Sequence, residues 1–204
     1  MDITIPTRWR KARTALAAVL LAAGLGLVAP AGASASTAAA VPVSGLSWHN
    51  CGIVWGSLPR SNATNLGPSQ DPITNIRAGR HACFDRLVVD VRGEAPRYTV
   101  RYVPEVVQDG SGAVVPLRGG AFLQVTVLAP AHDSDYNATY SPANPKEAVN
   151  VAGFATFRQV AFLGTFEAVT QIGLGVRARL PFRVFTLDGP GDGSRLVVDV
   201  AHRW

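Results

Sequence analysis

Arginine side chains are the residues whose placement most suggests binding chemistry. Arg97 and Arg101 lie two positions either side of Thr99, and Arg177 and Arg179 alternate with apolar residues, with Arg183 close by. Because alternate side chains of a strand share a face, each pair is expected to point in one direction. Guanidinium groups are planar forks that match carboxylates and phosphates. These five arginines are therefore the candidate ligand-binding residues; the alternative is an ordinary solvated sheet face balanced by acidic side chains.

Residue types that support catalysis or metal binding do not occur at recognisable spacings. No HExxH pattern and no G-x-S-x-G turn is present. Gly173-Leu174-Gly175 imitates part of a dinucleotide-binding motif but lies inside a strand pattern. The loop 188–193 is better explained as a hairpin turn than as a calcium loop. We predict no catalytic residues, no metal and no cofactor. The four histidines are His49, His81, His132 and His202.

The amino-terminal segment has the three parts of a secretory signal. A basic cluster (Arg8, Arg10, Lys11, Arg13) precedes an apolar run over 15–29 and a small-residue stretch, AGASASTAAA. The pattern predicts a signal peptide over 1–35, with cleavage near Ser34 or Ser36. An uncleaved anchor is the alternative, but the run is shorter than the roughly 20 residues that span a bilayer. We expect a secreted or cell-envelope protein with no membrane span after cleavage.

Removal of residues 1–35 changes the charge of the protein. The whole chain has 19 basic and 14 acidic residues, net +5, but the segment holds four of the basic residues and one acidic residue. The remainder therefore has 15 basic and 13 acidic residues, net +2. This small excess does not favour nucleic acid as a partner, because such proteins carry a clustered basic face.

The two cysteines, Cys51 and Cys83, form an even pair in a chain that is predicted to be exported. A disulfide is the expected state of such a pair. The alternatives, two free thiols or half of a metal site, lack further Cys or His residues at ligand spacing. The bond would tie an amino-terminal extension to the first core strand.

In the rest of the chain, short segments of alternating apolar and polar residues are typical of a β protein. Residues 36–79 are rich in Ser, Asn, Gly and Pro, and we interpret them as an extension; a domain over 80–204 follows. About seven short strands separated by Gly/Pro turns, without a long amphipathic helix, predict an all-β fold, a small β-sandwich. A short helix is considered around 147–155. The expected strands cover 84–91, 97–103, 121–128, 157–163, 167–176, 182–187 and 195–200.

Two further features stand out along the chain. The polar stretch 130–147 is long for a connection, and such loops are usually mobile or functional; we interpret it as a mobile insertion. The hexapeptide RLVVDV occurs at 86–91 and again at 195–200, which suggests two equivalent strands. His81 and His202 bracket this pair of strands, so they could approach one another or simply cap the strand ends.

Several stretches together resemble the AMIN-like domain of exported actinobacterial proteins. They are HACFDRLVVDV, YTVRYV, FRQVAFLGTFEAVTQIGLGVRARLPFRVFTL and RLVVDVAH, and the likeness covers roughly 80–204. The AMIN domain, to which this group is loosely related, is a small β-sandwich thought to bind peptidoglycan. The resemblance thus implies a sandwich fold and a binding role at the cell wall.

Three hypotheses follow for the function. The first is an exported, non-catalytic envelope protein that binds peptidoglycan or another anionic wall polymer. The second is an extracytoplasmic interaction module, an inhibitor or assembly factor, that contacts another envelope protein through the 130–147 loop. The third, a hydrolase, is the least favoured because no nucleophile–base pair or metal set can be assembled from the motifs.

Overall fold

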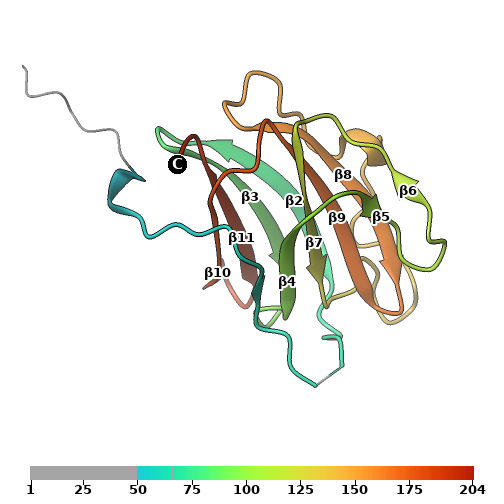
Figure 1. The fold of residues 1–204 in the computed structure, drawn as a ribbon. Coiled ribbons are helices and arrows are strands. Elements are labelled where there is room, and N and C mark those ends of the chain that lie inside the picture. Colours follow the sequence, from blue (N-terminus) through green and yellow to red (C-terminus); the bar gives the residue numbers. More distant parts are fainter. Residues whose placement is uncertain (1–49, 66) are drawn as a thin grey trace, which may run out of the picture. The chain divides into compact units, whose positions relative to one another are not determined.

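The computed structural model describes residues 50–65 and 67–204, drawn in colour in Figure 1. The predicted signal peptide, the first part of the extension and His49 lie outside the described residues. The fold class is confirmed. The described part is all-β and consists of two antiparallel sheets packed face to face, with a small two-stranded sheet beside them.

The first sheet has four strands in the order β10-β11-β3-β2. They are β10 (Phe182–Asp188), β11 (Ser194–Ala201), β3 (Phe84–Val91) and β2 (Ile73–Arg80). The two copies of RLVVDV lie side by side in β3 and β11, antiparallel, with Val88 opposite Val197 at the centre. In this register the arginine of each copy faces the aspartate of the other, so the repeat pairs with itself.

The second sheet has five strands in the order β1-β4-β7-β9-β8. They are β1 (Arg60–Ser61), β4 (Tyr98–Val103), β7 (Ala121–Val127), β9 (Val169–Val176) and β8 (Phe157–Phe166). Strand β1 is short because the chain of the extension touches the edge of β4 over two residues only. All five strands are antiparallel to their neighbours.

The hydrophobic core lies between the two sheets. Leu87 and Val89 of β3 meet Leu123 and Val125 of β7 in one cluster, and all four side chains are fully buried. They occupy alternate positions of their strands, as expected for a sheet with one face on the core. For β3, the alternation in the sequence, with Leu87, Val89 and Val91 on one face, agrees with this burial.

The outer face of the five-stranded sheet is partly covered by the hairpin of β5 (Val106–Val107) and β6 (Val114–Val115). Two glycines in β9 permit this contact. A Cβ on Gly173 would lie 2.9 Å from the Leu117 side chain, and one on Gly175 would lie 2.0 Å from the carbonyl oxygen of Arg118. The Gly-Leu-Gly pattern is thus explained by close approach of a covering segment.

Residues 73–79, which the sequence suggested for the extension, form most of β2 instead. The strand is irregular, since a bulge between Ile73 and Asn75 shifts its pairing with β3. As a result Ile73 and Ile76, three residues apart, are both buried. The bulge removes the simple alternation by which a strand is recognised in a sequence.

The helix considered around 147–155 does not form. A single 3-10 turn, η2 (Pro145–Glu147), is capped by the Asn144 side chain, which accepts from the N–H of Lys146. The chain then turns away, because the N–H of Ala148 donates to the carbonyl oxygen of Val160 in β8. Gly153 at φ +75° also departs from helical geometry.

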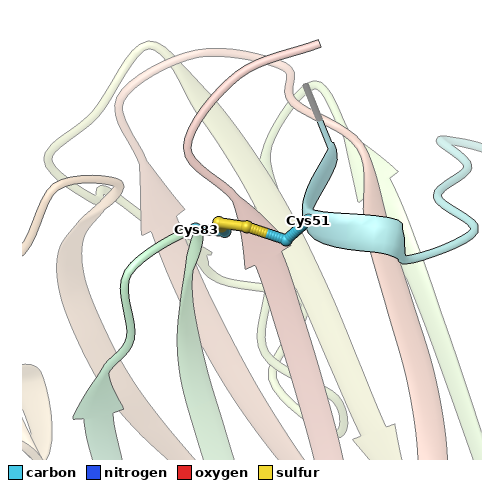
Figure 2. The surroundings of a disulfide bond; sticks show 2 residues. All are labelled: Cys51 and Cys83. Carbon is cyan, nitrogen blue, oxygen red and sulfur yellow. A yellow bond between two sulfur atoms is a disulfide. The ribbon is translucent and has the colours of Figure 1, made fainter. Parts of the chain in front are cut away.

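The predicted disulfide between Cys51 and Cys83 is confirmed, with Cα atoms 6.3 Å apart. Figure 2 shows it joining the turn η1 (Asn50–Gly52) to the segment that leads into β3. Five residues after Cys51 the extension also forms a bridge between Gly56 and Phe182 at the start of β10. The extension is therefore fixed to the four-stranded sheet at two points on either side of Trp55.

Candidate functional site

The outer face of the four-stranded sheet carries a row of charged side chains, which we call the Arg-Asp-Arg row. Cross-strand pairing places Arg183 of β10, Asp199 of β11 and Arg86 of β3 next to one another. The Asp199 carboxylate is fully buried and accepts from both guanidinium groups: Nε of Arg86 lies 2.6 Å from Oδ1, and Nε of Arg183 lies 2.8 Å from Oδ2. Two cations share one anion, so the row has an excess of one positive charge.

Aromatic rings surround this row. The guanidinium carbon of Arg183 lies 5.0 Å from the ring centre of Phe185, 5.5 Å from that of Phe84 and 5.6 Å from that of Trp55. Arg86 lies within similar distance of Phe84 and Phe185. The rings hold the arginines by cation–π attraction while the arginine side chains stay partly exposed, 31% for Arg183 and 24% for Arg86. Two planar donor groups are thus presented to solvent between apolar surfaces.

The five predicted arginines do not share one surface. Arg183 belongs to the Arg-Asp-Arg row, whereas Arg101 is exposed on the outer face of β4 in the opposite sheet. The outer faces of two packed sheets point in opposite directions, so these two side chains cannot converge on one ligand site. Arg97 precedes β4, where its guanidinium donates to the carbonyl oxygen of Gly67.

Arg177 and Arg179 are exposed in the connection between β9 and β10, beside the carboxyl-terminal residues. The guanidinium of Arg177 donates to the carbonyl oxygen of His202, and the carbonyl oxygen of Arg179 accepts from the indole N–H of Trp204 at 3.1 Å. Three of the five candidates, Arg177, Arg179 and Arg183, therefore lie at the end of the domain where the connection, the carboxyl-terminal residues and the start of β10 meet.

The β9–β10 connection is held in place by Tyr102 of β4. The Tyr102 hydroxyl donates to the carbonyl oxygen of Leu180 at 2.7 Å, and the N–H of Leu180 donates back at 3.0 Å. Burial raises the pKa of Tyr102, because the charged phenolate is poorly solvated there. The guanidinium of Arg179 packs over the same ring at 4.6 Å. Arg179 is thus fixed on both its backbone and its side chain.

The described histidines have structural partners. His202 Nε2 lies 3.1 Å from the carboxylate of Asp85, which is fully buried and also accepts from the N–H groups of Thr156 and Phe157. His81 stacks on Phe84 at 4.4 Å between ring centres. Among residues 50–65 and 67–204, no group of three His, Cys, Asp or Glu side chains could hold a metal ion.

The loop 130–147, interpreted from the sequence as a mobile insertion, has local structure of its own. His132 and Ala138 form a bridge, and the Asp133 carboxylate accepts from the N–H groups of Asp135 and Asn137, each at 2.9 Å. The hydrogen bond from the Asn137 backbone is the largest of the causes that hold the pKa of Asp133 below its ordinary value. At the tip, Tyr136 is 83% exposed at φ +62° and stacks on His132.

Several site residues were not recognised in the sequence. Arg86 and Asp199 are separated by 113 residues, and only the register of β3 against β11 brings them together. A signal was nevertheless present, because the two copies of RLVVDV carry opposite charges at positions one and five. The aromatic residues Trp55, Phe84 and Phe185 follow no spacing that would reveal a common site.

Comparison with known proteins gives one match. The sequence model of the AMIN-like domain matches residues 71–202, which begin just before β2 and end just after β11. Neither the curated proteins nor the solved structures contain a match. Within the described residues no helix is long and apolar enough to cross a membrane. The matched segment covers every strand of the two sheets except β1 and well over half of the sequence, and the chain belongs to the AMIN-like domain family.

Proposed function

We propose that this protein is exported and binds an anionic cell-wall polymer, such as peptidoglycan, without catalysing a reaction. Family membership suggests a cell-wall-related binding module. The Cys51–Cys83 disulfide is consistent with an extracytoplasmic location, because such bonds persist in oxidising compartments. The signal-like segment over 1–35 supplies the route of export.

The observation that carries the binding proposal is the Arg-Asp-Arg row and its aromatic surroundings. Asp199 balances one of the two guanidinium groups and fixes both in position, so one positive charge is left for an anionic ligand. Carboxylates of stem peptides and phosphates of wall polymers match the guanidinium fork. The outer face of the other sheet is partly covered by the β5–β6 hairpin, which leaves the four-stranded sheet as the better platform.

Co-sedimentation with purified sacculi tests this proposal. Protein produced from the full chain, with its disulfide oxidised, is expected to sediment with sacculi. Arg183→Ala is expected to weaken binding by roughly tenfold, as is common when one anchoring side chain of an interface is truncated. The matched control is Arg101→Ala, an exposed arginine on the opposite sheet face. Absence of wild-type binding, or an equal loss in the two variants, would contradict the proposal.

Export is tested separately by the amino terminus of the protein recovered outside the cytoplasm. Mass spectrometry is expected to show a start near Ser34 or Ser36. A protein that retains residues 1–35 would support the alternative of an uncleaved anchor.

A second candidate function is protein interaction through the 130–147 loop. The exposed Tyr136 at positive φ, on a turn braced by Asp133, favours it, because a rigid exposed aromatic side chain is a common interface anchor. Replacing 134–136 by glycines should abolish cross-linking to an envelope partner and leave sacculus binding unchanged. Loss of sacculus binding together with cross-linking would argue that the loop belongs to the wall-binding surface.

A further inference from the structure

An apolar cavity of about 500 Å³ lies where the extension meets the carboxyl-terminal residues. We call it the indole groove, because Trp55 and Trp204 both line it. Its other lining residues are Gly52, Ile53, Val54 and Pro181, none of which carries a charge. Its size falls within the range of about 300–1,000 Å³ usual for small-ligand sites.

The groove exposes apolar surface that a soluble domain normally buries. Trp204 is 69% exposed and Val54 is 91% exposed. Trp204 is nevertheless held, since its indole N–H donates to the carbonyl oxygen of Arg179. A large aromatic ring whose polar edge is already bonded, and whose remaining surface meets solvent, is arranged to receive an apolar surface of a ligand.

An arginine side chain stands beside one of the two tryptophans. The guanidinium carbon of Arg183 lies 5.6 Å from the ring centre of Trp55, whereas Trp204 is bonded to the backbone oxygen of Arg179, whose own guanidinium packs over Tyr102. The side chains that line the groove are therefore uncharged, and Arg183 places a positive charge at the margin next to Trp55. This arrangement is complementary to a ligand with an apolar face and anionic substituents at its edge.

We propose that the indole groove binds a pyranose ring of an anionic wall glycan. The C–H groups of a pyranose form an apolar face that packs on indole rings, while its hydroxyl and acidic substituents lie at the periphery and reach water and Arg183. This inference rests on the proposed function and deepens it. It assigns the sugar chain of the polymer to the groove, next to the Arg-Asp-Arg row that takes the acidic groups.

A peptide fits the groove less well. Each buried residue of a peptide brings a carbonyl oxygen that needs a hydrogen-bond donor. The only polar groups on the side chains that line the groove are the indole N–H groups, and that of Trp204 already donates to Arg179. A sugar ring that buries only its C–H face makes no such demand.

Titration with two soluble probes tests the inference on protein made from the full chain. One probe is the neutral β-1,4-linked tetramer of N-acetylglucosamine, and the other is glycan strands freed of stem peptides. Both are expected to shift the indole N–H resonances of Trp55 and Trp204. Trp204→Ala is expected to weaken both affinities roughly tenfold, as for other aromatic anchors. The control is Phe166→Ala, an exposed aromatic residue of β8 that is 48% exposed.

The possible results separate this inference from the proposed function. Sacculus binding without binding of either soluble probe would overturn the groove assignment and leave the wall-binding proposal standing. Equal effects of Trp204→Ala and Phe166→Ala would overturn it as well. Competition by a proline-rich peptide for the groove would also overturn the assignment, because it would identify a peptide as the occupant. A dimer detected by sedimentation velocity and lost in Trp204→Ala would overturn it too, because the occupant would then be a second copy of the chain.

Discussion

Replacing Asp199 by asparagine tests the reasoning about the Arg-Asp-Arg row most directly. The carboxylate is fully buried and accepts from Arg86 and Arg183. The amide has the same shape but no charge, and its NH₂ group would offer a donor to the guanidinium groups in place of an acceptor. The substitution therefore removes the interaction without creating a cavity.

The size of the effect follows from burial. Breaking a buried ion pair by removing one partner costs about 3–5 kcal/mol, because the other charge is left without compensation. Here the two arginines are 24% and 31% exposed, so water can partly solvate them once Asp199 is neutral. We therefore expect a loss of about 2–4 kcal/mol in the free energy of unfolding, or roughly 5–15 °C in Tm for a domain of this size.

The chain supplies a matched control in the other copy of the repeat. Asp90 occupies the same place in RLVVDV and pairs with Arg77 at 2.8 Å, but the two side chains are 21% and 49% exposed. Asp90→Asn should cost less than about 1 kcal/mol, as surface pairs do. Urea unfolding followed by circular dichroism measures both variants. Equal losses, within about 0.5 kcal/mol, would refute the argument that burial decides the strength of these pairs.

Three further outcomes are expected. Gly175→Ala should lower the free energy of unfolding, measured in urea, by about 1–3 kcal/mol or more, because the new Cβ would meet a backbone oxygen. The control Gly79→Ala should be nearly neutral, because its Cβ would meet nothing closer than 3.8 Å. An NMR titration should give the Asp133 carboxyl a pKa below its ordinary value. Because the pKa is lowered, the stabilising effect of this carboxylate is present above about pH 4 and is lost as the pH falls through the folded-state pKa. An unshifted pKa would contradict the conclusion that Asp133 braces the loop. The double variant Cys51→Ser/Cys83→Ser should lose about 3.5 kcal/mol through the freed chain entropy, and an unchanged denaturation midpoint would show that the extension is fixed without the bond.

The sheets were largely predictable because their residues follow local rules. In β3 the alternation of Leu87 and Val89 with charged or outward residues is visible without any partner, and the burial of these side chains agrees with it. Strand β2 was missed because its bulge breaks that alternation. The short strands β5 and β6 were missed because two residues each are too few for a periodic pattern.

The candidate site was much less predictable, since its geometry depends on long-range register. Spacing grouped Arg183 with Arg101, but it could not say that the two lie on opposite sheets. The row itself depends on residues 113 positions apart. Trp204 acquires its role from a hydrogen bond to the β9–β10 connection, which no local pattern encodes.

The self-pairing of RLVVDV has a consequence for how the chain reaches its fold. Strand β3 meets in β11 the same six residues that it carries itself, related by a local two-fold axis through Val88 and Val197. The β3 strands of two unfolded molecules could therefore pair in the same register, with the same crossed charges. Specificity here comes from connectivity: the correct partner belongs to the same molecule, and its effective concentration exceeds that of any neighbour in dilute solution. Because the two strands are identical over six residues, correct pairing depends on β3 and β11 belonging to the same chain and on the protein being dilute.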